Sequence, residues 1–147
     1  MRIGFISTME GCPWGGSELL WSQTADRMAR SGFEVGVCVR HWPETPKHVQ
    51  QLADSGCRLF IRQPRTLLRR ATAKLGIGQN RDWAWLRQFR PDLVVISLGI
   101  HLEGSEAAAA CRALGIPYVL VIQSADENRW PGDDFLNPLG ITIELAS

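Results

Sequence analysis

Short apolar runs alternate with segments of helical periodicity along this chain, and that alternation is what most limits its fold. The runs occupy residues 2–7, 33–39, 57–61, 92–97 and 118–122. Between most of them, apolar residues recur every three or four positions, which is typical of amphipathic helices. Strands that alternate with helices form parallel sheets covered by helices on both faces. The pattern predicts a three-layer α/β Rossmann-like domain with a parallel sheet in the order 3-2-1-4-5.

The length of 147 residues fits one such domain. We expect the domain to occupy 1–137, with 138–147 as a tail or the start of an interdomain region, because the pattern fades after Asn137. The first apolar run is too short for a signal peptide, and no stretch approaches the roughly 20 apolar residues that span a bilayer. A soluble, cytoplasmic domain is therefore expected.

Charge and cysteine content exclude several function classes. The net charge of +1 does not favour nucleic-acid binding. Cysteines 12, 38, 57 and 111 form no C-x-x-C pair and have no histidine at zinc spacing. We expect small buried thiols in a reducing compartment, with disulfides or metal binding as less favoured alternatives. No metal and no cofactor is expected.

A glycine-rich loop between the first strand and the first helix is the strongest candidate for ligand binding. In open parallel sheets, ligands bind beyond the carboxyl ends of the strands. Gly15 and Gly16 let a ligand approach the backbone closely, and the following helix presents free N–H groups. Ser17 is the expected N-cap, and Glu18 lies in the first helical turn. The dinucleotide and P-loop fingerprints are absent, and a simple helix-starting turn remains the alternative.

Three segments in order resemble a known family. They are Gly15-Gly16-Ser17-Glu18 with a helix ending in Gly32-Phe33-Glu34-Val35, then Arg90-Pro91-Asp92-Leu93-Val94-Val95, then Gly115-Ile116-Pro117-Tyr118. Together they resemble the amino-terminal domain of family 4 glycosyltransferases over about residues 2–132. The resemblance implies one half of a GT-B enzyme, in which two Rossmann-like domains face each other across a cleft. The amino-terminal half binds mainly the acceptor, and the carboxyl-terminal half binds mainly the nucleotide-sugar donor.

The resemblance also assigns roles to residues. It implies that Gly15 and Gly16 face the donor phosphates and the acceptor across the cleft, and Glu18 matches the same motif by position. With Ser17 in the same loop, and Gln123 and Ser124 after the fifth strand, these are the expected substrate-binding residues. The family often has a histidine where this chain has Gln123, and glutamine does not titrate near neutral pH.

Three further residues are candidates for catalysis. Asp126 and Glu127 could accept hydrogen bonds from an acceptor hydroxyl, or one could act as general base, unless the pair is only a solvated turn. His101 could point into the same cleft or lie in an exposed loop. No catalytic nucleophile is assigned.

The basic residues are concentrated in one part of the chain. Nine of them and one acidic residue lie between Arg58 and Arg90, against seven basic and fourteen acidic residues elsewhere. Within this part, 65–75 predicts a helix with a basic face and an apolar face. Such a helix can lie on an anionic membrane, here the inner face, or it can be an ordinary surface helix.

Two functions follow as hypotheses. The first is the acceptor-binding domain of a glycosyltransferase of the hexosyltransferase type, acting on a glycan or lipid-linked acceptor and inactive without its carboxyl-terminal domain. The second is a non-catalytic sugar- or partner-binding Rossmann-like domain, which the glutamine at 123 favours.

Overall fold

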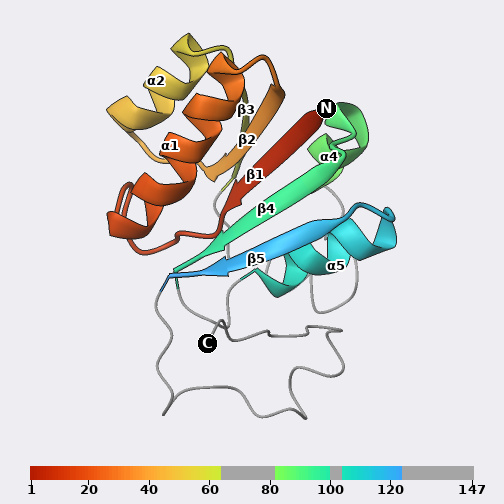
Figure 1. Ribbon diagram of the computed structural model, residues 1–147. Helices are drawn as coiled ribbons and strands as arrows, with labels where there is room; N and C mark the ends of the chain where they lie inside the picture. Colours follow the sequence, from red (N-terminus) through yellow and green to blue (C-terminus); the bar gives the residue numbers. More distant parts are fainter. Residues whose placement is uncertain (64–81, 100–103, 124–147) are drawn as a thin grey trace, which may run out of the picture.

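The computed structural model describes residues 1–63, 82–99 and 104–123, shown in colour in Figure 1. Its elements, in chain order, are β1 (Arg2–Ser7), α1 (Gly16–Arg30), β2 (Glu34–Arg40), α2 (Lys47–Asp54), β3 (Arg58–Arg62), α4 (Ala84–Phe89), β4 (Leu93–Leu98), α5 (Ser105–Ala113) and β5 (Tyr118–Ile122).

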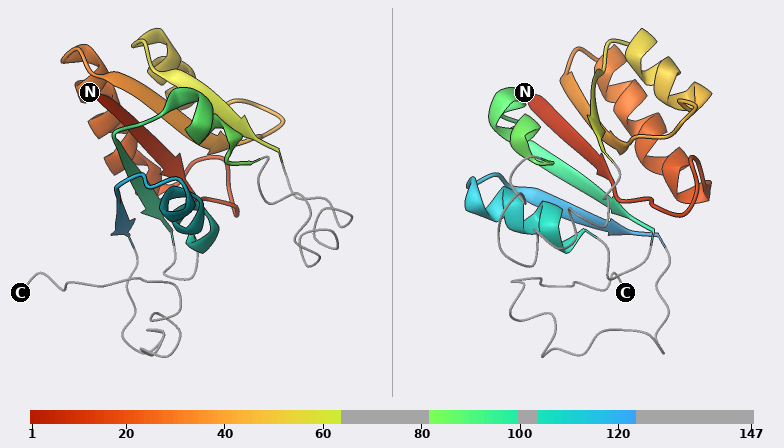
Figure 2. Two further views of the ribbon diagram at one scale, coloured as in Figure 1. Left: turned by 90° about the vertical axis from the view of Figure 1, so that its right-hand side faces the viewer. Right: turned by 180° about the vertical axis from the view of Figure 1, so that it is seen from behind.

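The five strands form one parallel sheet in the order β3-β2-β1-β4-β5, which confirms the predicted topology. β1 lies at the centre, and the chain turns to opposite sides of it to build the two halves of the sheet. Helices α1 and α2 cover one face, while α4 and α5 cover the other (Figure 2). The domain is therefore a three-layer α/β sandwich of the Rossmann-like type.

Each face of the sheet has its own apolar core. Val35, Val37 and Val39 alternate along β2 and all face α1 and α2. On the opposite face, Val94 and Ile96 pack against the helices α4 and α5. These side chains are almost completely buried, and burial of apolar area is the main term that stabilises such a domain.

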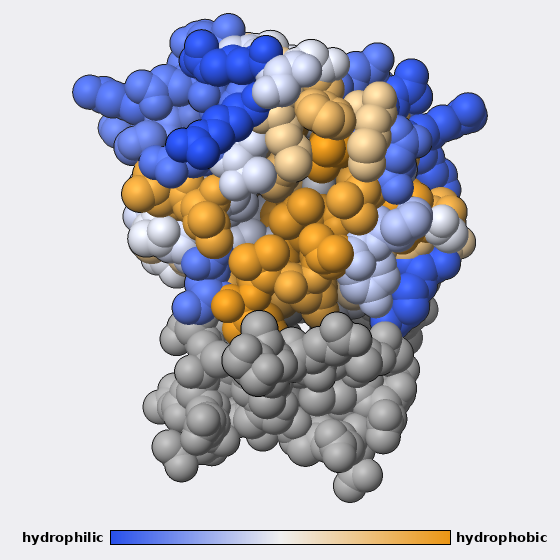
Figure 3. Space-filling model, viewed as in Figure 1, coloured by the Kyte–Doolittle hydropathy of each residue, from blue (hydrophilic) through white to orange (hydrophobic). Residues whose placement is uncertain are grey.

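The half of the sheet next to β5 is open on the α1 side. Figure 3 shows a continuous apolar area there, in the centre of the face seen in Figure 1. Val95 and Val119 are register partners in β4 and β5, and Val119 is 46% exposed. Among the described residues, no helix covers this part of the sheet.

Two glycines of the sheet leave room for the aromatic side chains of α4. Gly4 and Gly36 are direct register partners in β1 and β2. A Cβ at Gly36 would lie 2.8 Å from the Phe89 ring, and a Cβ at Gly4 would lie 3.0 Å from the Trp85 ring. The two rings thus rest on bare backbone, which brings α4 close to the sheet.

The start of α1 differs by two residues from the one expected from the sequence. Gly15, in extended conformation, is the N-cap of α1, and Ser17 lies inside the first turn without making a side-chain cap bond. Pro46 is the N-cap of α2. Gly32 and Gly56, which follow α1 and α2, take the left-handed conformation that terminates a helix.

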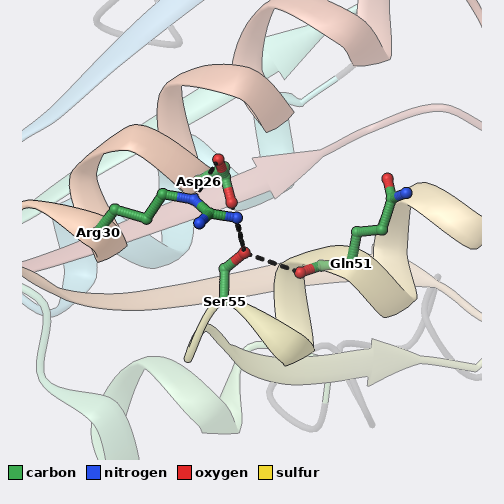
Figure 4. A network of polar contacts seen from close by, with 4 residues as sticks. All are labelled: Asp26, Arg30, Gln51 and Ser55. Carbon is green, nitrogen blue, oxygen red and sulfur yellow. Dashed lines mark hydrogen bonds and ion pairs between the residues drawn. The ribbon is translucent and has the colours of Figure 1, made fainter.

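A polar network ties α1 to α2 (Figure 4). Arg30 donates from Nε to Asp26 Oδ2 at 2.9 Å and from Nη2 to Ser55 Oγ at 3.2 Å. The Ser55 hydroxyl, just after α2, also faces Asp26 Oδ1 and the carbonyl of Gln51. Hydrogen bonds from Arg30 and then from Ser55 lower the pKa of Asp26 below its usual value.

We expect Ser55→Ala to lower the free energy of unfolding by about 0.5–1.5 kcal/mol, because it removes the hydroxyl that joins the two helices. The lowered pKa of Asp26 means that this contribution is complete above the pKa of an unfolded Asp. The part that involves Asp26 is lost as the pH falls through the folded pKa of Asp26, which lies below the usual value. Urea unfolding at pH 7 and at a series of decreasing acidic pH values measures both effects. Ser31→Ala, at the exposed C-cap of α1, is the control, and a loss that stays constant over the whole series would contradict the expectation.

Candidate functional site

The candidate site lies at the carboxyl ends of β1 and β4, where the order of the strands reverses around β1. Ser7 and Ser97 are register partners at this edge. Thr8 donates to the carbonyl of Ser97 from both its backbone nitrogen and its hydroxyl, each at 3.1 Å. The backbone N–H of Gln123 donates to the carbonyl of Leu98 at 3.1 Å. These bonds hold a row of polar residues at the place where doubly wound sheets bind ligands.

Two polar side chains at this edge have buried atoms that are not hydrogen bonded. Ser97 Oγ and Gln123 Nε2 have no partner among the described residues. Ser97 is only 3% exposed. Buried polar groups in folded proteins are nearly always paired with protein, water or ligand. The edge can therefore accept at least one additional polar group.

The glycine loop lies beside this edge, and Gly15 and Gly16 differ in how much free space surrounds them. A Cβ at Gly15 would lie 3.2 Å from the methyl group of Met9 and 3.6 Å from Cys12 Sγ. A Cβ at Gly16 would meet nothing within 4 Å. The first N–H groups of a helix have no partner within the helix. Gly16 thus presents the start of α1 with open space next to it, while Gly15 is partly covered.

Glu18 is turned into the protein. Its side chain accepts a hydrogen bond from the Ser7 hydroxyl at 3.0 Å and from Trp21 Nε1 at 2.9 Å. Glu18 is 4% exposed and Trp21 is 3% exposed. The structure thus gives this carboxylate the role of fixing α1 to the end of β1. Its predicted role in substrate binding stays a prediction, as do the roles of Gly15, Gly16, Ser17 and Gln123.

Aromatic side chains pack on the other side of the loop, and the sequence alone did not predict these contacts. Trp14 stacks on His48 with ring centroids 4.6 Å apart, and the Arg40 guanidinium lies 4.9 Å from the ring of Trp42. Arg40 also donates to the carbonyl of Glu10 at 2.8 Å. These contacts stabilise the outer side of the loop. In the sequence, the tryptophan directly before the two glycines was the feature that could have indicated them.

The remaining candidates lie outside the described residues. They are His101, Ser124, Asp126 and Glu127, together with the basic segment 65–75. Within the described ranges, no group of three His, Cys, Asp or Glu side chains could hold a metal ion. No helix in those same ranges is long and apolar enough to cross a membrane.

All four thiols are free, and three of them are buried. Burial raises the pKa of Cys38 to about 12 and the pKa values of Cys57 and Cys111 to about 11. Cys12, in the glycine loop, is only half-buried, which differs from the expectation that all four would be buried.

We therefore expect iodoacetamide at pH 8 to modify Cys12 well before the other three thiols in the folded protein, because burial hides those three from the reagent and raises their pKa values, and only the thiolate reacts. Mass spectrometry would show one adduct on the native chain and four after denaturation. Cys12→Ser should remove the fast adduct, and a second fast adduct in that variant would contradict the burial of the other thiols.

Residues 14–143 match the sequence model of glycosyltransferase family 4. The chain belongs to this family. The match includes the glycine loop and all the strands after β1, and it ends beyond the expected domain boundary at 137. The candidate site described above therefore belongs to a glycosyltransferase-type domain.

One of two similar solved structures, the first described here, supports the fold. The chain is similar to leucoanthocyanidin reductase from Vitis vinifera in complex with NADPH, with 19% identity and a TM-score of 0.53, over 95% of this chain and 42% of the reductase. It is also similar to UDP-GlcNAc 2-epimerase from Neisseria meningitidis bound to UDP-GlcNAc, with 15% identity and a TM-score of 0.42, over 82% of this chain and 32% of the epimerase. The family member described here thus spans less than half of either chain. No curated protein matches the sequence.

Proposed function

We propose that this chain is the acceptor-binding, amino-terminal domain of a GT-B glycosyltransferase that transfers a sugar from a nucleotide-sugar to a glycan or lipid-linked acceptor. The open approach to Gly16 at the start of α1 carries the proposal. Hydroxyl and phosphate oxygens are suitable acceptors for the N–H groups at a helix start. The family membership of the chain supports a sugar as the ligand. A second domain would supply most of the donor contacts.

Gly16→Ala tests this proposal because it separates binding from folding. The added Cβ meets no protein atom, so the variant should be as stable as the parent or up to about 1 kcal/mol more stable, since alanine favours a helix. The same Cβ would occupy the space next to the first N–H groups of α1. We expect it to weaken binding of soluble oligosaccharides, such as maltoheptaose and mannotetraose, by about 10-fold or more, equivalent to about 1.4 kcal/mol.

The measurement is a titration of the ¹⁵N-labelled chain followed through the backbone amide signal of residue 16. Gly11→Ala is the matched control, because it lies in the same loop and its Cβ would also meet nothing within 4 Å. UDP-glucose should bind weakly or not at all. Equal oligosaccharide affinity in both variants, or tight binding of UDP-glucose, would contradict the proposal.

One observation favours a second candidate function, a non-catalytic sugar- or partner-binding domain. Gln123 stands where the family often has histidine, and its Nε2 group is buried without a partner in the described part of the chain. An amide can bind a hydroxyl but cannot move a proton. Gln123→His would distinguish the two functions. A gain of transferase activity in the two-domain protein supports the enzyme, and unchanged oligosaccharide binding with no transfer in either form supports the binding domain.

The basic segment 65–75 adds a peripheral membrane position to the proposal. Lysine and arginine near an anionic bilayer contribute about 1 kcal/mol each at low salt. Pelleting of the chain with phosphatidylserine vesicles, against phosphatidylcholine vesicles, measures this. Binding that does not depend on the anionic lipid would contradict it.

A further inference from the structure

A cavity of about 350 Å³ lies between the ends of β2 and β3 and the start of α4. Its volume is at the lower end of the range for small-molecule pockets, which is about 300–1,000 Å³. It opens on the side of the sheet that carries α4, away from the glycine loop beside α1. The described residues that line it are Cys38, Phe60, Ile61, Arg62, Gln63, Asp82 and Trp85.

The wall of the cavity contains polar groups that a ligand would satisfy. Trp85 is 6% exposed, and its Nε1–H has no oxygen or nitrogen partner in the described ranges. The Trp85 indole and the Arg62 guanidinium both reach the Cys38 thiol, which is only a weak acceptor. Arg62 Nε is also buried without a partner among these residues. A buried donor left in this state is unfavourable, and a ligand oxygen would remove that cost.

Arg62 connects the cavity to the candidate site. Its Nη2 donates to the carbonyl of Ser7, the last residue of β1, while its guanidinium lies 5.3 Å from the ring of Trp83. One guanidinium therefore reaches the end of β1 and lines the cavity. A chain of linked rings bound at the end of β1 could continue into the cavity along this side chain.

The chemistry of the lining selects among ligand classes. An anion would meet the carboxylate of Asp82, and an apolar molecule would leave the Trp85 and Arg62 donors unsatisfied. A ligand with several hydroxyl groups can accept from Trp85 and Arg62 and donate to Asp82, because each hydroxyl does both. The aromatic side chain of Phe60 offers an apolar wall for the C–H face of a ring.

We propose that this cavity binds a sugar ring of the acceptor, as a subsite next to the crevice between β1 and β4. The inference rests on the proposed function, because it takes the acceptor to be a glycan. Gln63 at the rim and Trp85 in the wall are its specificity-determining residues, and Arg62 positions the ring relative to the end of β1.

The test uses methyl glycosides of glucose, mannose and galactose at about 10 mM, ten times the roughly 1 mM dissociation constant expected of so small a ligand. The readout is the indole Nε1–H signal of Trp85 in the ¹⁵N-labelled chain, identified by its disappearance in Trp85→Phe. At least one glycoside should shift this signal in the parent chain. Gln63→Ala should weaken that binding about 3- to 10-fold, the effect of one hydrogen bond. Gln23→Ala, at an exposed glutamine of α1, should leave it unchanged.

The outcomes separate this inference from the proposed function. Oligosaccharide binding that shifts the Gly16 amide, with a Trp85 signal that stays still, overturns the subsite and leaves the function standing. A shift of Trp85 that Gly16→Ala does not alter in oligosaccharide titrations supports the subsite and overturns the glycine loop as the binding element. No shift of either signal overturns both.

Discussion

Replacing Gly104 by alanine is expected to lower the free energy of unfolding by about 2–5 kcal/mol, which combines backbone strain with a steric clash. Gly104 is the N-cap of α5 and has φ of +86°, a conformation that strains any residue with a side chain. Its Cβ would overlap Leu98 Cδ2 and lie 3.3 Å from Ile96 Cγ2. Both neighbours belong to the core under α5, where there is little space to move.

Gly115→Ala is the matched control for Gly104→Ala. Gly115 also has positive φ, at +65°, but a Cβ there would meet nothing within 4 Å. It should cost only the strain, about 1–2 kcal/mol. Urea unfolding followed by circular dichroism measures both variants. Equal losses would show that the core relaxes around the added methyl group and that the clash contributes nothing.

Glu18→Ala is expected to lower the free energy of unfolding by about 2–4 kcal/mol, because it leaves two buried donors unpaired. The Ser7 hydroxyl and the Trp21 indole both donate to this carboxylate. Glu18→Gln keeps an oxygen for the indole, and Ser7 can rotate its hydroxyl to accept from the amide. It should therefore lose less than half as much, with the Trp21 indole signal retained in the NMR spectrum.

The outcome also distinguishes the two roles of Glu18. A Glu18→Ala variant of normal stability that no longer binds oligosaccharides would contradict the structural role and favour direct ligand binding. Similar losses in both variants would mean that the negative charge matters more than the hydrogen-bond geometry.

The order of strands and helices could be predicted because buried parallel strands leave continuous apolar runs, as Leu93-Val94-Val95-Ile96 shows. The exact helix starts could not, since Ser17 and Gly15 compete as caps and the backbone conformation decides between them. The place of the glycine loop followed from topology alone. The contact between Glu18 and Ser7 of β1 could not be predicted, because only folding brings these two residues together. The cavity near Trp85 draws on three separate segments, and no local pattern indicates it.

The bare backbone at Gly4 and Gly36 has a consequence for how this domain can change its sequence. Because the Phe89 ring lies against Gly36, a methyl group at 36 requires a smaller side chain at 89. Phe89→Leu and Gly36→Ala should each be unfavourable alone and partly compensate one another when combined, with a coupling energy of about 0.5–3 kcal/mol. The residues at positions 36 and 89, although 53 places apart in the chain, should therefore co-vary among related sequences.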